Sequence, residues 1–218
     1  MTHCDSTFDP EAGAFQADVE IQERREAYKG YFQVDAYRLR HRKFNGEWTR
    51  PIEREVFERG HAVAVLLYDP EKDAVVLIRQ FRIGAYAAGR LPWLTEVVAG
   101  IIGPGETVEE VARRESFEET GCVVTTLEKI CDYLVSPGGT SESVIVFCGR
   151  TVAPQNGEIH GLDDENEDIQ VIVESADRAI EILDEDRLNN GVAIIALSWF
   201  ARHRDTLRRR WLHSGASS

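Results

Sequence analysis

Hydrophobic and polar positions alternate near the start of the chain, which predicts extended structure. Residues 31–38, YFQVDAYR, place polar and aromatic side chains in turn with mainly apolar ones, the period of a β-strand. Asn45-Gly46 then predicts a tight turn, because both residues tolerate a positive φ. A second extended run follows, ending near Phe57. We therefore expect an N-terminal β-hairpin domain over residues 18–57, preceded by residues 1–17, which lack any period and are predicted to be disordered.

The middle of the chain carries apolar runs separated by turn residues. HAVAVLLYD (61–69) and AVVLIRQFR (74–82) have the length and composition of buried strands, with PEKD between them as a turn. WLTEVVAG (93–100) is also predicted to be extended, and GPGE at 103–106 then breaks the strand. Later segments with strand character lie at 123–134, 143–151 and 168–174.

A long helix is predicted directly after the glycine loop, in TVEEVARRESFEETG. Thr107 and Glu110 have the spacing of a capping box, and Gly121 is a natural residue to end the helix. Two more helices are predicted at 176–185 and 191–208. The mixture of strands with a few helices predicts an α/β or α+β fold, with residues 58–218 as one domain.

Charge and composition narrow the classes of function. The 218 residues carry a formal net charge of −13, which argues against general nucleic-acid binding, because phosphate backbones repel that field. No run approaches the ~20 apolar residues of a membrane span, and the N-terminus lacks the apolar core of a signal peptide. The four cysteines lack C-x-x-C spacing and are interpreted as reduced thiols of a cytoplasmic protein. The basic stretch RHRDTLRRR (202–210) is interpreted as solvated charge at a helix end, with a binding patch as the alternative.

Three glutamates within a turn and a half of the predicted helix form the most informative cluster. Glu115 and Glu119 are four residues apart and project from one face, with Glu118 on the flank and Arg114 beside them. Like charges at this spacing repel, so a fold alone has no use for them. Mg²⁺ and Mn²⁺ prefer oxygen ligands and would offset the repulsion. A solvated acidic face is the alternative for an isolated E-x-x-E-E run.

The residues around this cluster carry a family resemblance. From Gly100 the chain reads GIIGPGETVEEVARRESFEETGC, which resembles the Nudix box, G-x5-E-x7-R-E-U-x-E-E-x-G-U, where U is a bulky apolar residue. Every fixed glycine, glutamate and arginine is present, and the departures are Ser116 and Cys122 at two U positions. The resemblance implies an α/β/α sandwich, hydrolysis of a nucleoside diphosphate derivative, and Mg²⁺ or Mn²⁺. It also implies four metal ligands: the backbone carbonyl of Ala99 and the carboxylates of Glu115, Glu118 and Glu119.

Stretches outside the box are similar to the bacterial ADP-ribose pyrophosphatase group of that family. They include RQFRIGAY (79–86), SPGGTSE (136–142) and IHGLDDENEDI (159–169). This resemblance implies Mg²⁺-dependent hydrolysis of ADP-ribose to AMP and ribose 5-phosphate. It also implies that Arg54 and Arg82 bind the diphosphate, since guanidinium groups pair with phosphate oxygens.

The same resemblance assigns the remaining roles. Gly138 and Glu142 are expected to contact substrate from the SPGGTSE loop. Glu165, in the acidic loop, is expected to activate water, with Glu167 left open as the alternative base. The N-terminal hairpin is expected to be exchanged between the subunits of a homodimer.

Two other functions stay open at this point. One is a Nudix hydrolase of other nucleoside diphosphate derivatives, such as nucleotide sugars, dinucleoside polyphosphates or NADH. The other is a non-catalytic sensor of ADP-ribose or a related nucleotide. The intact acids speak against the sensor, because binding alone does not need them.

Overall fold

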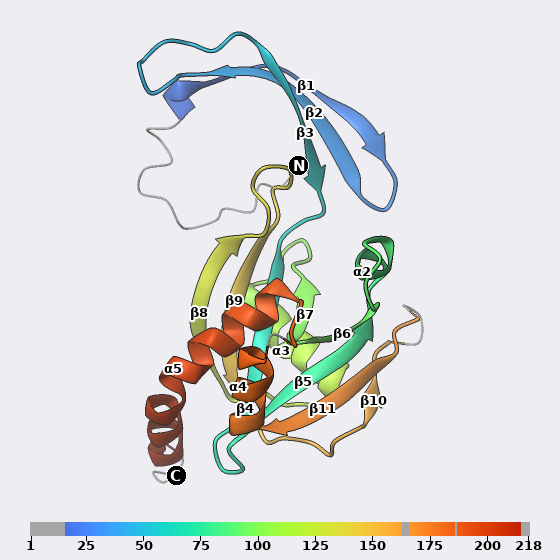
Figure 1. Ribbon diagram of the computed structural model, residues 1–218, viewed down its shortest axis with the longest axis vertical. Coiled ribbons are helices and arrows are strands. Elements are labelled where there is room, and N and C mark those ends of the chain that lie inside the picture. The colour runs from blue at the N-terminus through green and yellow to red at the C-terminus, as the bar shows by residue number, and fades with distance from the viewer. Residues whose placement is uncertain (1–15, 163–165, 186, 215–218) are drawn as a thin grey trace. The chain divides into compact units, whose positions relative to one another are not determined.

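The computed structural model describes residues 16–162, 166–185 and 187–214, in two compact units (Figure 1). The first unit extends to His61 and also includes Leu134–Ser143, and the second contains Ala62–Tyr133 and the chain from Val144. Most of the N-terminal segment predicted to be disordered, residues 1–15, lies outside the described residues. Its last two residues, 16 and 17, belong to a short 3-10 turn, Gln16–Asp18.

The first unit is built on a three-stranded antiparallel sheet in the order β1-β2-β3, with β1 at Val19–Lys29, β2 at Gln33–His41 and β3 at Ile52–Glu58. The expected hairpin corresponds to β2 and β3, and Gly46 in their connection has φ 85°. Strand β1 was not predicted, because its sequence is mostly charged and it is exposed along its whole length. It forms by pairing with β2, which alternation within its own sequence does not reveal.

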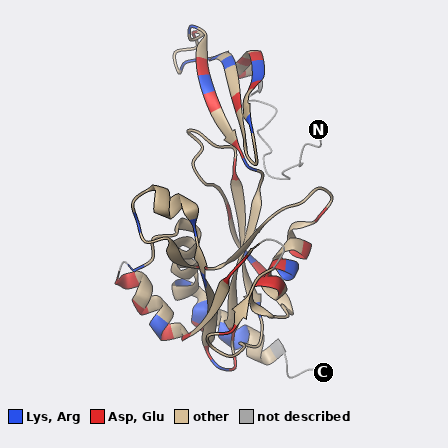
Figure 2. Ribbon diagram, turned by 90° about the vertical axis from the view of Figure 1, so that its right-hand side faces the viewer, with Lys and Arg blue, Asp and Glu red and all other residues tan. Residues whose placement is uncertain are grey.

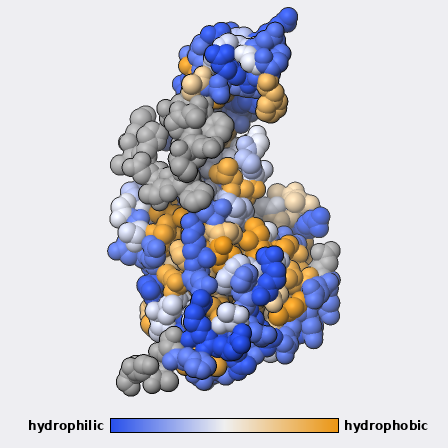
Figure 3. Space-filling model, turned by 90° about the vertical axis from the view of Figure 1, so that its left-hand side faces the viewer, coloured by the Kyte–Doolittle hydropathy of each residue, from blue (hydrophilic) through white to orange (hydrophobic). Residues whose placement is uncertain are grey.

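The surface of this sheet is strongly charged. Basic and acidic residues are interspersed along the three strands (Figure 2), and the sheet is mainly hydrophilic in the space-filling view (Figure 3). Arg24 donates two hydrogen bonds to the buried Asp35, at 2.8 and 2.5 Å. Small sheets with this little apolar burial are marginal alone.

The loop Leu134–Ser143 is attached to the end of β3. The Phe57 N–H donates to the Gly139 carbonyl at 2.8 Å, and the Thr140 hydroxyl donates to the Phe57 carbonyl at 2.8 Å. A parallel bridge joins the same two residues, Phe57 and Thr140. The first unit is therefore discontinuous in sequence.

The second unit contains a mixed sheet in the order β10-β11-β5-β4-β9-β8, in which β4 and β9 are parallel and the other recorded pairs are antiparallel. Two short strands extend it, β6 pairing with β5 and β7 pairing with β4. The bounds are β4 Ala62–Asp69, β5 Ala74–Phe81, β6 Trp93–Glu96, β7 Val98–Ile101, β8 Thr126–Leu134, β9 Ser143–Arg150, β10 Ile159–His160 and β11 Ile169–Ser175.

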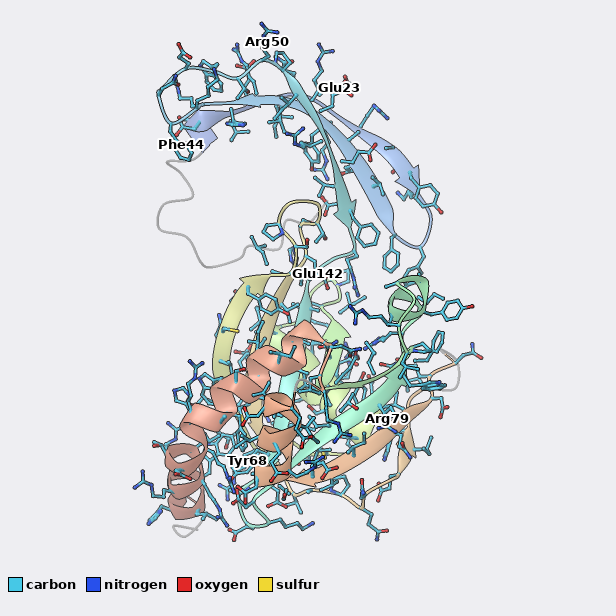
Figure 4. All side chains as sticks on the ribbon, viewed as in Figure 1. Glu23, Phe44, Arg50, Tyr68, Arg79 and Glu142 are labelled. Carbon is cyan, nitrogen blue, oxygen red and sulfur yellow. The ribbon has the colours of Figure 1, made fainter. Side chains whose placement is uncertain are left out.

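Helices cover both faces of this sheet, which confirms the predicted α/β/α sandwich (Figure 1). Alternate residues of β4 face the two layers: Val63, Val65 and Leu67 pack on the α3 side, and Ala64, Leu66 and Tyr68 on the other. Tyr68, labelled in Figure 4, packs edge-on against Phe200 of α5, with ring centroids 4.8 Å apart. The helices are α2 Ile83–Ala87, α3 Val108–Thr120, α4 Ala176–Asp184 and α5 Gly191–Ser214.

In the second unit most predicted elements are present, with four differences. The run at 93–100 is two strands separated by Val97, because its halves pair with different neighbours. The last helix continues to Ser214, six residues beyond the predicted end, and buries Leu207 and Trp211. The short elements α2 and β10 were missed, since neither is long enough to show a period. Within the described residues, no helix combines the length and apolarity needed to cross a membrane.

The C-terminal end of α3 yields a prediction about stability. Gly121 has φ 69°, and a Cβ there would lie 3.1 Å from Cε1 of His160. Gly121→Ala is expected to lower the free energy of unfolding by about 1–2 kcal/mol for the left-handed conformation alone, and by more because of the histidine. Gly105, with φ 84° and nothing within 4 Å of an added Cβ, provides the control Gly105→Ala. Equal losses for both variants in urea unfolding would exclude the His160 contribution.

Candidate functional site

The acidic helix α3 begins as predicted. The Thr107 hydroxyl accepts from the Glu110 N–H at 3.3 Å, and Glu110 accepts from the Thr107 N–H at 2.9 Å, a complete capping box. Because the helix is fixed at both ends, the carboxylates of its last two turns have defined positions. Two of them, Glu115 and Glu119, lie against β7, the strand that contains Ala99 and Gly100.

Arg114 holds three of the acids together. Its Nε donates to Glu106 at 3.0 Å, and its Nη1 donates to Glu115 at 2.8 Å and to Glu118 at 2.9 Å. Glu106 also accepts from the Gly103 N–H at 2.8 Å. The guanidinium and this N–H lower the pKa of Glu106. One cation thus offsets the repulsion of three carboxylates.

Glu119 is buried behind this network, with 3% of its surface exposed, and accepts from the Ala99 N–H at 3.2 Å. Glu115 lies so close to the neighbouring Gly100 that a Cβ there would be 1.9 Å from Oε1. Gly100 is therefore required for close approach of strand and helix, since only glycine leaves room for the carboxylate. Gly100 is the first glycine of the sequence pattern, and Glu115 is the residue that it accommodates.

Burial makes both inward-facing acids unusually basic. It raises the pKa of Glu119 well above the ordinary value, and the charge of Glu115 adds to the effect, while the Ala99 N–H and Arg82 oppose it. Burial also raises the pKa of Glu115, assisted by Glu118 and opposed by Arg114. Such raised pKa values are typical of carboxylates at functional sites, where they bind a cation or take up a proton.

Glu167 belongs to the same electrostatic cluster. Its charge contributes to the raised pKa of both Glu115 and Glu119. Its Oε2 accepts from the Leu162 N–H at 3.3 Å, and its own N–H donates to the Leu162 carbonyl at 3.2 Å. Gly161 permits this close turn, with φ 112° and an added Cβ only 2.7 Å from that of Glu167. Glu165, predicted as the base, lies outside the described residues.

The donor set fits a hard divalent cation in its chemistry. Glu115 and Glu119 are largely buried carboxylates with a cost of desolvation that a cation would remove. Among the residues that the structure describes, no three His, Cys, Asp or Glu side chains form a ready-made metal cluster. The positive charge beside Glu115 and Glu118 comes from Arg114, which forms an ion pair with each of them.

Arg82 is the predicted diphosphate ligand in the second unit. It follows β5, and its guanidinium pairs with Glu96 at 2.7 Å. Its charge acts on Glu119, so it lies within electrostatic range of the acids. The sequence reading missed Glu96, which is 3% exposed. A carboxylate within the apolar run WLTEVVAG was the available signal.

The other predicted substrate residues, Arg54, Gly138 and Glu142, belong to the first unit. Arg54, on β3, lies opposite Tyr37 of β2, and both line a cavity of about 330 Å³ within this unit. An added Cβ at Gly138 would have nothing within 4 Å. Glu142, labelled in Figure 4, is 8% exposed and lies 3.6 Å from Arg59 Nε, whose buried N–H has no hydrogen-bond acceptor among the described residues.

Comparison with known proteins agrees with this geometry. Residues 58–190 match the model of the NUDIX domain, more than half of the chain. The chain belongs to the Nudix family. The matched segment contains the whole α3 site of this Nudix protein, from Ala99 to Gly121, together with Arg82 and Glu96.

Several curated proteins are similar to this Nudix chain. An ADP-ribose pyrophosphatase of Escherichia coli (strain K12) is 47% identical over 194 residues, covering 89% of this chain and 93% of the relative. An ADP-ribose pyrophosphatase of Haemophilus influenzae is 38% identical, covering 91% and 93%. A GDP-mannose pyrophosphatase of Pectobacterium atrosepticum is 33% identical, covering 84% and 97%. A solved structure described as an ADP compounds hydrolase has the same fold, with a TM-score of 0.63, 20% identity, and coverage of 92% and 97%.

The contact between Gly100 and Glu115 yields a prediction about metal affinity. In Gly100→Ala, the new methyl group would displace the flexible carboxylate rather than the backbone. We expect Mn²⁺ affinity, measured by electron paramagnetic resonance titration, to fall about 10- to 100-fold. Gly84→Ala, where an added Cβ meets nothing within 4 Å, is the matched control. Unchanged Mn²⁺ affinity in Gly100→Ala would contradict the assignment of Glu115.

The buried Glu119 yields a prediction about pH. The pKa of Glu119 in the folded protein is raised above the ordinary 4.5. Its contribution to the free energy of unfolding is therefore greatest below pH 4.5 and is lost as pH rises through the folded pKa. Glu119→Gln removes this loss. In EDTA we therefore expect the variant to have a higher Tm than the wild type at pH 8, and the difference to shrink toward pH 4.5. Parallel Tm profiles for the two proteins would refute the effect.

Proposed function

We propose that the chain is a pyrophosphohydrolase that cleaves ADP-ribose to AMP and ribose 5-phosphate. The observation that carries the proposal is the 47% identity, over 89% of the chain, to an enzyme named ADP-ribose pyrophosphatase. The similarity includes the first unit as well as the Nudix segment, because it extends beyond the 133 positions from 58 to 190. The acids of α3 support catalysis over a purely binding role, since a sensor has no need of them.

We infer that Mg²⁺, or Mn²⁺, is held by the Ala99 carbonyl, Glu115 and Glu119, with Glu118 assisting. Such a cation, when bound, offsets pyrophosphate charge and increases the acidity of water. Arg114 orients Glu115 and Glu118 by hydrogen bonds of 2.8 and 2.9 Å. The raised pKa of Glu115 and Glu119 supports this assignment, because both carboxylates lack a full counter-charge.

The remaining roles concern the substrate. Arg54 and Arg82 bind the diphosphate, and Gly138 and Glu142 contact the substrate from their loop. Glu165 takes the proton of the attacking water in our proposal. Glu167 is the alternative base, and its influence on the α3 acids is the observation that favours it.

We further propose a cytoplasmic homodimer in which residues 18–57 are exchanged between subunits. The exposure of all of β1, including its apolar residues Val19, Ile21 and Tyr28, supports a covering partner. The free thiols of Cys122, Cys131 and Cys148 support a reducing compartment. Burial raises the pKa of all three, so they remain protonated.

A second candidate substrate is GDP-mannose. The relative from Pectobacterium atrosepticum, named a GDP-mannose pyrophosphatase, covers 84% of the chain at 33% identity. ADP-ribose is favoured because the identity to the relatives named for it is higher.

Incubation with ADP-ribose and Mg²⁺, followed by product identification, tests the function. We expect AMP and ribose 5-phosphate in equal amounts, and a lower kcat/KM for GDP-mannose. Glu119→Gln should reduce kcat by about 10²-fold or more, because it removes a ligand charge where the transition state needs it. Tight binding of ADP-ribose without AMP release would indicate a sensor instead. Full turnover by Glu119→Gln at saturating Mg²⁺ would remove Glu119 from the mechanism.

A further inference from the structure

Glu96 is a buried carboxylate that the α3 site does not explain. It ends β6 and lies three positions before Ala99 in sequence, with 3% of its surface exposed. A buried carboxylate is costly unless charged and polar partners surround it. Apolar residues of similar size stabilise a core at least as well, so a buried acid here calls for a reason other than stability.

Both oxygens of Glu96 are engaged. Oε2 accepts from Nε and Nη2 of Arg82, at 2.9 and 2.7 Å. Oε1 accepts from Nδ2 of Asn190, at 2.7 Å. The carboxylate therefore connects the end of β5 to the start of α5.

Asn190 is itself fixed by the helix that it begins. Its Oδ1 accepts from the Ala193 N–H at 3.1 Å, the bond of an N-cap residue. With the oxygen used in this way, the amide nitrogen is directed at Glu96. The two ends of this side chain thus have separate tasks, one in capping α5 and one in holding the carboxylate.

Arg82 is held at both ends. Its N–H donates to the Pro92 carbonyl at 2.8 Å, and its carbonyl accepts from Ala85 at 3.1 Å. A free arginine side chain loses roughly 2 kcal/mol of rotamer entropy on being ordered. The bonds to Glu96 impose that order before any ligand arrives, which is preorganisation.

The edge of the Arg82 guanidinium that Glu96 binds determines which N–H groups are left for an anion. A guanidinium has five N–H groups, and the bonds from Nε and Nη2 occupy one side edge. Three N–H groups remain. One on Nη1 and one on Nη2 form the end edge, which can pair with two phosphate oxygens, and the second N–H of Nη1 lies on the opposite side. Glu96 therefore orients Arg82 without blocking the donors that an anion would use.

We propose that Glu96 and Asn190 are positioning residues that aim the Arg82 guanidinium at the substrate diphosphate. This inference rests on the proposed function, because it takes Arg82 as a diphosphate ligand. Neither Glu96 nor Asn190 touches the substrate in this scheme. The ligand chemistry is that of any pyrophosphate diester, so the device serves ADP-ribose and GDP-mannose alike.

Glu96→Gln tests the inference in a double-mutant cycle with Arg82→Met. We expect Glu96→Gln to lower kcat/KM for ADP-ribose about 10- to 100-fold, mainly through KM, since misplaced binding groups have effects of this size. In the Arg82→Met background the same change should cost less than about 2-fold, because coupled residues are not additive. Equal losses in both backgrounds would overturn the inference and make Glu96 a structural residue.

Asn190→Ser is a milder second variant, which decides the matter if Glu96→Gln does not fold. Serine keeps an N-cap oxygen for α5 but removes the amide that holds Glu96. We expect KM to rise several-fold with kcat little changed. An unchanged KM would overturn the role of Asn190.

Asp73→Asn is the matched control for loss of an acid that pairs with arginine. Asp73 pairs with Arg204 and Arg208 and has φ 53°, which asparagine tolerates. It should lower Tm without changing KM, and an equal rise in KM would overturn the inference.

Wild-type enzyme is assayed in parallel. Absence of AMP from the wild type would refute the proposed function alone, and the cycle is then measured with GDP-mannose or whichever other nucleoside diphosphate derivative is cleaved.

Discussion

The structure of the site depends on repulsion among carboxylates that the fold forces together. Helix α3 brings Glu115 and Glu119 against β7, with Glu118 on the flank, and burial shields Glu119 from water. Arg114 offsets part of this repulsion through direct hydrogen bonds. Glu119 has no bond to that arginine and retains a carboxylate with a strongly raised pKa. The remaining imbalance is the physical observation that supports the divalent cation proposed for this site.

The rest of the second unit serves to maintain that arrangement. Strand β4 contributes to two apolar layers at once, so α3 packs against a sheet that is itself supported by α4 and α5. Because Gly100 has no side chain, the Glu115 carboxylate of α3 can lie directly against β7. Arg82 and Glu96 continue the same pattern, in which a charged group is fixed by a buried partner of opposite sign.

Much of this was predictable from sequence where a local rule applies. The capping box at Thr107, the end of α3 at Gly121 and the strands β4 and β5 follow from spacing and period. Strand β1 and the pairing of Glu96 with Asn190, 94 positions apart, depend on partners distant in the chain. No periodicity in a single segment encodes such contacts, so the positions of the acids were predictable and the residues that hold Arg82 were not.

The attachment of Thr140 to Phe57 limits how this protein can be divided. A cut after His61 would leave the loop Leu134–Ser143 on one fragment and β3 on the other, each lacking its bonding partner. The amino-terminal sheet is thus not a module that recombination could add or remove at a single position in the gene. Any exchange that preserved the fold would have to replace two separate pieces of the gene together.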